Sequence, residues 1–191
     1  MISAASEVKT IIKAMDHWED HTCIRFVPRT TERDYVSFFP GGGCYSYVGR
    51  IGRNQGISVG RQCFAVYTAV HEIGHALGFY HEQSRPDRDE HVEIVYDNIV
   101  AGADSEFEKL SDTQVDSLGV GYDYNSIMHY DANLYSRNGN PTIIALDPNI
   151  PIGKARVLSE LDIEQTKRLY NCPSTYNNMA AYFLVHALSL F

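Results

Sequence analysis

The segment from residue 71 to residue 81 limits the possible folds more than any other part of the chain. It reads HEIGHALGFYH, with histidines at positions 71, 75 and 81. If residues 64–77 form a helix, His71 and His75 are four residues apart and lie on one face, one turn above the other. The two imidazoles can then bind the same ion, so this pattern predicts both a helix and a candidate metal site.

The residues around this pair extend the prediction. Gly78 falls three residues after His75, where a glycine can adopt a left-handed conformation, end the helix and turn the chain back. That turn can bring His81 close as a third ligand. Three neutral imidazoles leave one position of a tetrahedral zinc ion open for water, which is typical of a catalytic site. Glu72 lies beside the first histidine without having to coordinate, which suits a general base.

Two histidines on a helix are more often structural than metal-binding. Here, however, five positions in eleven residues are fixed as H-E-x-x-H-x-x-G-x-x-H, which is the metzincin signature of zinc proteases. The stretch HEQSRPDRD at residues 81–89 resembles the astacin family of zinc endopeptidases. SIMHY at residues 126–130 matches the methionine turn of the same family. The resemblance extends over roughly residues 7–172.

The resemblance implies an α+β, metzincin-like protease domain. Its N-terminal lobe would hold a twisted, mostly parallel or mixed sheet with two long helices, and its C-terminal lobe would be rich in loops with one C-terminal helix. It also implies one zinc ion per domain, an apolar floor for the site from Met128, and a metal-adjacent Tyr130 that stabilises the oxyanion. In this family Glu82 contacts a buried amino terminus, and we expect it to need another partner here.

Four cysteines and the net charge narrow the class of protein. The cysteines are too far apart in sequence for a thiolate zinc site, so we expect two disulfides and a secreted protein. Spacing leaves three connectivities open, and the resemblance implies Cys23 with Cys172 and Cys44 with Cys63. A formal charge of -8, with no cluster of Lys and Arg, excludes a nucleic-acid surface.

Periodicity predicts the remaining elements. Apolar residues such as Ile11, Ile12 and Trp18 recur at helical spacing over residues 3–20, where His17 and His21 have no ligand-spaced partner. Alternating β-forming residues predict strands at 23–27, 35–39, 44–48 and 57–59, with a flexible turn at 40–43. A capping box of Ser159 and Asp162 predicts a helix over 158–170.

The region between the histidines and the methionine turn gives weaker signals. We expect Arg88 and Glu90 to lie in a solvated, ion-paired loop, and His91 to be exposed and not bound to metal. Residues 92–95 form a short apolar run, and residues 101–117 can include a helix. No position in this region identifies the residue type that a substrate would present.

The two ends of the sequence depart from the family. Residues 1–6 lack the charged and apolar regions of a signal peptide, so we expect a fragment or a missing upstream sequence. Residues 179–191 are strongly apolar, but a membrane-spanning helix needs about 20 residues. We therefore predict a catalytic domain at 1–172, with its N-terminal segment absent, and leave 173–191 unassigned.

These features together predict a secreted zinc endopeptidase that acts on protein or peptide substrates, with His71, His75 and His81 as ligands and Glu72 as general base. The alternative is a non-catalytic, secreted zinc-binding domain or an inactive fragment. The intact ligands and Glu72 favour the enzyme. A metal-free structural domain ranks last, because it would have to match the motif by accident.

Overall fold

The computed structural model describes residues 4–61, 63–173 and 181–185. The chain forms two compact units. Unit 1 comprises residues 1–79, 156–158 and 166–191, and unit 2 comprises residues 80–155 and 159–165. Each unit buries apolar residues of its own.

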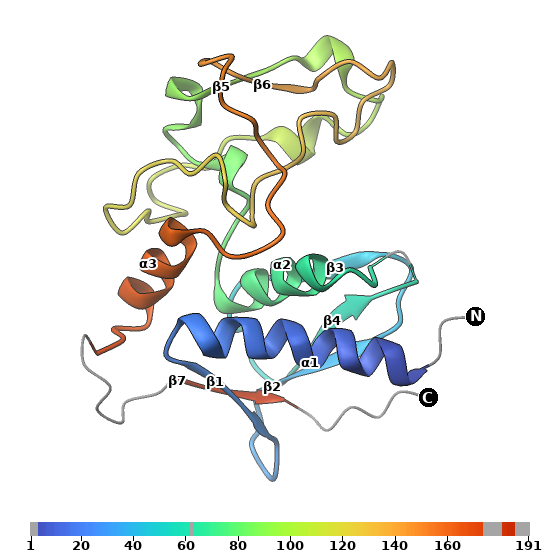
Figure 1. The fold of residues 1–191 in the computed structure, drawn as a ribbon, viewed down its shortest axis with the longest axis vertical. Coiled ribbons are helices and arrows are strands. Elements are labelled where there is room, and N and C mark those ends of the chain that lie inside the picture. The colour runs from blue at the N-terminus through green and yellow to red at the C-terminus, as the bar shows by residue number, and fades with distance from the viewer. Residues whose placement is uncertain (1–3, 62, 174–180, 186–191) are drawn as a thin grey trace. The chain divides into compact units, whose positions relative to one another are not determined.

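Unit 1 contains a five-stranded mixed sheet in the order β1-β7-β2-β4-β3 (Figure 1). The first four strands in this order are parallel to one another, and β3 runs antiparallel to β4. The predicted strands are confirmed, although the third is shorter and the fourth is longer than expected. Their bounds are Ile24–Pro28 (β1), Tyr35–Phe39 (β2), Cys44–Ser46 (β3), Asn54–Val59 (β4) and Ala181–Val185 (β7).

Strand β7 comes from the tail for which the sequence predicted no structure. Ala181 pairs with Ile24 at one end of β1, and Val185 pairs with both Pro28 of β1 and Val36 of β2. Within the described residues β1 pairs with no other strand, so β7 is what joins β1 to the rest of the sheet. The remaining positions of the predicted apolar tail lie outside the described residues.

Two helices, α1 (Ala4–His21) and α2 (Val66–Leu77), lie on the same side of this sheet (Figure 1). Trp18 joins them, because its indole N–H donates to the carbonyl of Val70 at 3.1 Å while its ring stacks on Phe79. The predicted helical face is largely correct, since Ile11 and Trp18 are buried. Ile12 is 40% exposed and does not belong to that face.

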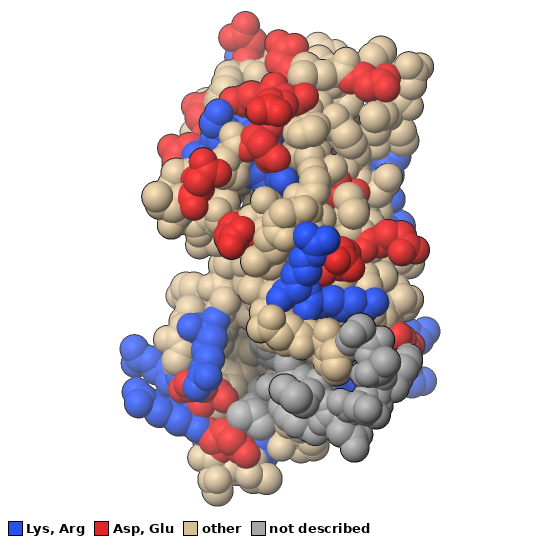
Figure 2. Space-filling model, turned by 90° about the vertical axis from the view of Figure 1, so that its left-hand side faces the viewer, with Lys and Arg blue, Asp and Glu red and all other residues tan. Residues whose placement is uncertain are grey.

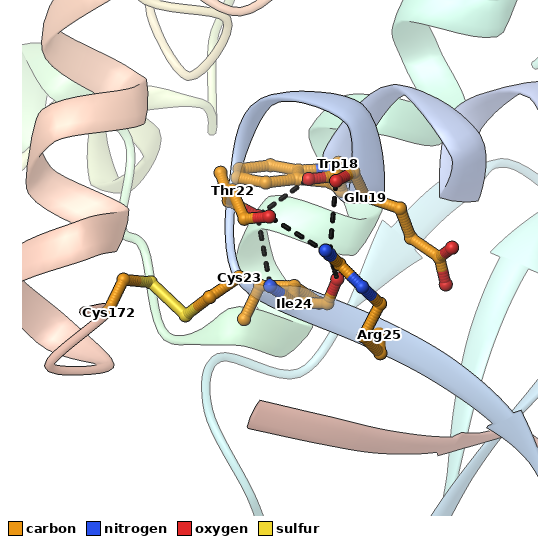
Figure 3. Close-up of a disulfide and its surroundings, with 7 residues drawn as sticks. All are labelled: Trp18, Glu19, Thr22, Cys23, Ile24, Arg25 and Cys172. Atoms are coloured by element: carbon orange, nitrogen blue, oxygen red, sulfur yellow. Dashed lines mark hydrogen bonds between the residues drawn. A yellow bond between two sulfur atoms is a disulfide. The ribbon is translucent and has the colours of Figure 1, made fainter. Parts of the chain in front are cut away.

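Both disulfides lie in unit 1, and their pairing is the one that the resemblance implied: Cys23 with Cys172 and Cys44 with Cys63. Hydrogen bonds order the turn beside the first of them (Figure 3). The Thr22 hydroxyl donates to the carbonyl of Trp18 at 2.6 Å and accepts from the N–H of Ile24 at 3.2 Å. The Arg25 guanidinium donates to the carbonyls of Glu19, Thr22 and Ile24. The junction between α1 and β1 is therefore fixed both covalently and by hydrogen bonds.

Unit 2 has little regular structure. Its only sheet within the described residues pairs β5 (Val92–Ile94) with β6 (Ile143–Ala145), and helix α3 (Glu160–Leu169) begins in this unit. Of the helix considered for 101–117, only a 3₁₀ turn at Asp104–Phe107 forms. The core of unit 2 is an apolar cluster of buried residues. Its members are Val92, Ile99, Ala103, Phe107, Tyr122, Tyr130, Ile143, Ala145 and Ile152.

The expectation of a solvated loop after the histidines is wrong for Arg88. Arg88 is only 5% exposed, and its guanidinium donates to the carbonyls of Gln83 at 3.1 Å and Phe107 at 2.5 Å. Glu90 is exposed, as expected. His91 is half-buried, because its ring stacks on Tyr122 with centroids 4.6 Å apart. Arg88 is therefore a buried cation, and its hydrogen bonds join its own segment to those of Gln83 and Phe107.

The two units also differ in charge. Seventeen of the 24 acidic residues, but only five of the 16 basic residues, belong to unit 2. Acidic side chains accordingly cluster over unit 2 in Figure 2. The negative charge of the chain thus comes from unit 2, while basic residues outnumber acidic ones in unit 1.

Candidate metal centre and active site

Three histidines form the candidate metal centre. His71 and His75 stand on consecutive turns of α2, with ring centroids 4.7 Å apart. Gly78 then adopts φ +116°, and its N–H donates to the carbonyl of His75, so the helix ends where the sequence predicted. Ligand atoms of His71, His75 and His81 all lie within 4.8 Å of one another. No other group of three or more His, Cys, Asp or Glu is gathered in this way in the described part of the chain.

His75 is held in the form that binds a metal. Its Nδ1–H donates to the carbonyl of Phe79 at 2.8 Å, which leaves Nε2 as the nitrogen with the lone pair. Burial lowers the pKa of His75 to about 3, and the neighbouring His71 contributes to this lowering. The imidazole is therefore neutral at physiological pH, as a ligand must be.

Glu72 lies between these ligands in sequence and is 4% exposed. Its Oε2 has no hydrogen-bond partner, and burial raises the pKa of Glu72 to about 8. A cation held by the adjacent histidines would lower this pKa and favour the carboxylate. Three imidazoles beside a buried carboxyl group with one unsatisfied oxygen are a donor set that fits zinc, and such a set leaves a position open for water.

The methionine turn is held by a residue whose role the sequence did not reveal. Asp162 was predicted as a cap of α3, and it does accept the Ser159 N–H at 2.9 Å. The same carboxylate also accepts the Ser126 hydroxyl at 2.7 Å and the Ile127 N–H at 2.9 Å. Met128 itself is buried, at 3% exposure, but its proposed place under the histidines stays a prediction.

Tyr130 lies at the end of this turn, with its ring centroid 4.3 Å from that of His81. Its hydroxyl is 3.5 Å from Oε2 of Glu106. Within unit 2 the fold thus brings the predicted oxyanion residue beside one of the three predicted ligands. His129 is not part of the histidine cluster.

Glu82 is buried and is held by contacts within unit 2. It is 6% exposed, and its Oε1 accepts the Asp123 N–H at 2.7 Å and the Arg85 guanidinium at 3.3 Å. Burial raises the pKa of Glu82 to about 8, and the charge of Arg85 acts in the opposite direction. Arg85 in turn pairs with Asp87 at 2.7 Å. Glu82 therefore fixes the chain immediately after the third histidine.

Among the described residues, no helix has both the length and the apolar character needed to cross a membrane. The described part of the predicted apolar tail is the strand β7.

Comparison with known proteins agrees with this site. The family model Astacin, which describes a family of peptidases, matches residues 2–171. Protein SpAN of Strongylocentrotus purpuratus is 47% identical over 89% of this chain, and zinc metalloproteinase nas-6 of Caenorhabditis elegans is 47% identical over 87%. The chain spans only 29% and 49% of the length of these two relatives.

The fold is also similar to that of a solved structure. High choriolytic enzyme 1, a hatching enzyme zinc-protease from Oryzias latipes, has a TM-score of 0.84 and 41% identity to this chain. The match covers 90% of this chain and 86% of the hatching enzyme chain. With a family model that covers most of its length and a structural neighbour of nearly the same extent, the chain belongs to the astacin family of peptidases.

Proposed function

We propose that the chain is a zinc-dependent endopeptidase that hydrolyses peptide bonds within proteins. The observation that supports this most is the cluster of His71, His75 and His81, with the buried carboxylate of Glu72 on the same helix as the first two. Zinc, when bound by these histidines, would polarise the scissile carbonyl and lower the pKa of a bound water to about 7.

Two residues of this chain would then carry the proton and the charge. Glu72 accepts a proton from the attacking water and passes it to the leaving amine, which is the work of a general base and acid. The Tyr130 hydroxyl donates a hydrogen bond to the oxygen on which negative charge develops. The proximity of the Tyr130 ring to His81 supports this role, since His81 is a proposed ligand.

The sheet of unit 1 suggests how a substrate is held. Strand β3 lies at the edge of the sheet and pairs, among the described strands, only with β4. An extended peptide can add to such an edge through backbone hydrogen bonds and place alternate side chains on either side. This arrangement supports a protein or peptide substrate bound in extended form along β3.

The two disulfides support secretion. Disulfides form and persist in oxidising compartments and are rare in the cytosol. All four cysteines of the chain are used in the two bridges. An extracellular place of action is therefore part of the proposal.

Cleavage of a quenched peptide library by the full chain, refolded with zinc, tests this function against a Glu72→Ala twin. We expect turnover that a chelator abolishes and zinc restores. The twin should keep its zinc and lose on the order of 10²–10⁴-fold in kcat. Tyr130→Phe should lose about 10²-fold and retain measurable turnover.

Two results would contradict the proposal in different ways. A parent protein that binds zinc, measured by elemental analysis, but cleaves no peptide would be a zinc-binding domain without catalysis. Equal and mild losses in Glu72→Ala and Tyr130→Phe would show that the two roles are assigned wrongly.

A further inference from the structure

The backbone of Tyr130 is held on three sides by residues that have no role in the proposed reaction. Its N–H donates to Oε1 of Gln83 at 3.2 Å, and its carbonyl accepts the Nδ1–H of His129 at 2.8 Å. On the third side Gly153, with φ +66°, lies so close that a Cβ there would overlap the carbonyl oxygen of Tyr130 and the Cα of Asp131. The segments that carry Gln83 and Gly153 thus converge on the two peptide groups that flank the Cα of Tyr130.

The hydrogen bonds of His129 fix its tautomer. A backbone carbonyl can only accept, so the proton of the neutral ring is on Nδ1. Nε2 must then be an acceptor, and it takes the hydroxyl proton of Tyr122 at 2.8 Å. Both ring nitrogens are engaged, and the ring is 6% exposed. The carbonyl of Tyr130 therefore sets the tautomer, and Tyr122 holds Nε2 so that the ring keeps its Nδ1–H directed at that carbonyl.

Tyr122 is itself firmly placed. Its ring stacks on His91 with centroids 4.6 Å apart and an interplanar angle of 12°, and the Arg85 guanidinium lies 5.7 Å from its ring centroid. The residue is 7% exposed. A hydroxyl held this rigidly is a suitable donor for setting the orientation of a second ring.

Gln83 fixes the N–H of Tyr130 but leaves one of its own buried polar atoms unsatisfied. It is fully buried, and its Nε2 has no hydrogen-bond partner while its Oε1 accepts from Tyr130. Turning the amide over would place two donors against each other, so the orientation is set by Tyr130. An unsatisfied buried donor is unfavourable, and here it accompanies the fixing of a single backbone N–H.

We propose that Tyr122 and His129 are positioning residues which, together with Gln83 and Gly153, immobilise the two peptide groups on either side of the Tyr130 Cα. Movement of Tyr130 is then limited to rotation of its side chain about a fixed Cα, so the hydroxyl has a restricted set of positions. This inference rests on the proposed role of the Tyr130 hydroxyl in the reaction. Catalysis depends on such fixed orientation, because a displacement of about 1 Å can cost on the order of 10²-fold in rate.

Tyr122→Phe is the test, because it removes one hydroxyl and keeps the ring. Tyr124→Phe is the matched control: Tyr124 belongs to the same aromatic group, and its hydroxyl donates to the carbonyl of His91 at 3.2 Å instead of to His129. We expect Tyr122→Phe to lower kcat on the order of tenfold with KM within about twofold. Tyr124→Phe should leave both constants within about twofold.

Two further measurements separate positioning from a general structural effect. In a Tyr130→Phe background, where the hydroxyl is absent, adding Tyr122→Phe should cause no further loss of kcat. Nitrogen-15 NMR of the His129 ring should show the proton on Nδ1 in the parent and in both variants, and the Nε2 resonance should shift only in Tyr122→Phe, where that nitrogen loses its hydrogen bond. Amide exchange at Tyr130 should accelerate only in Tyr122→Phe.

Three outcomes would overturn the inference: a parent with the His129 proton on Nε2, equal kcat values for Tyr122→Phe and Tyr124→Phe, or the same loss from Tyr122→Phe with and without the Tyr130 hydroxyl. If the parent cleaves no peptide, the proposed function fails. The tautomer and the amide exchange still decide whether Tyr122 and His129 immobilise Tyr130.

Discussion

Unit 1 and unit 2 hold their residues in place by different means. Unit 1 has a five-stranded sheet, two helices on one side of it, and both disulfides. Unit 2 has, in its described part, one short pair of strands and no cysteine, and it buries Arg85, Arg88 and Asp162 among backbone donors and acceptors. Unit 2 also has an apolar cluster, but apolar packing is non-directional, whereas each of its buried polar contacts requires a particular geometry.

The two units should therefore be sensitive to different substitutions. Removing one partner of a buried hydrogen bond leaves the other unsatisfied, so unit 2 should be sensitive to single polar substitutions. Unit 1 should respond more to loss of its crosslinks and strand pairing. The two can be followed separately, because Trp18 is the only tryptophan and lies in unit 1, while the exchange rates of individual amides can be assigned to either unit.

The largest expected effect on stability comes from Arg88→Ala in unit 2. This change leaves the carbonyls of Gln83 and Phe107 without the donor that Arg88 supplies, and should lower the free energy of unfolding of unit 2 by about 4 kcal/mol. Amide exchange of unit 2 in urea measures it. Arg50→Ala is the control, since the Arg50 side chain is 79% exposed and pairs only at the surface, where ion pairs contribute little. Similar small losses from both would remove the contrast between the units.

Loss of a crosslink should act on unit 1. The bridge between Cys44 and Cys63 joins positions 19 residues apart, so Cys44→Ser together with Cys63→Ser should cost roughly 3 kcal/mol. Urea unfolding followed by Trp18 fluorescence measures this. Amide exchange within unit 2 serves as the internal control and should change little, and an equal acceleration there would show that the units do not unfold independently.

Strand β7 provides a third test. Phe183→Pro removes one backbone N–H from a strand that lies between β1 and β2, and should lower the stability of unit 1 by about 2 kcal/mol. Phe183→Ala keeps the N–H and isolates the backbone contribution. Exchange of the β1 amides should accelerate more in the proline variant, and identical rates in the two variants would contradict the strand order.

The smallest expected effect comes from a single hydroxyl in unit 1. The Tyr170 hydroxyl donates at 2.8 Å to the carbonyl of Leu77, the last residue of α2. Tyr170→Phe should therefore cost about 1 kcal/mol, measured by Trp18 fluorescence in urea. Tyr47→Phe, at a residue that is 62% exposed, is the comparison and should have no measurable effect.

Sequence reasoning succeeded where the local environment repeats. The apolar spacing of residues 3–20 and the alternation of residues 35–39 predicted α1 and β2 nearly to the residue. The predicted left-handed Gly78 ends α2, and the spacing of the three histidines anticipated their cluster. These features depend on contacts a few residues apart, or on a motif with strict spacing.

The rest of the site depends on contacts between segments far apart in sequence, which no periodicity records. Asp162 reaches Ile127 across 35 residues, and Arg88 reaches Phe107 across 19. The charge of Arg88 suggested exposure, but backbone carbonyls surround it. Strand β7 was missed because its neighbours, β1 and β2, come from the opposite end of the chain.

The bridge between Cys23 and Cys172 has a consequence for the fate of a damaged molecule. It joins positions 149 residues apart, and the intervening chain includes all of unit 2 and all three clustered histidines. A single cut at any peptide bond between the two cysteines, by this protein or by another protease, leaves one covalent molecule. Such nicked molecules would migrate as a single species on a denaturing gel and separate into fragments only after reduction.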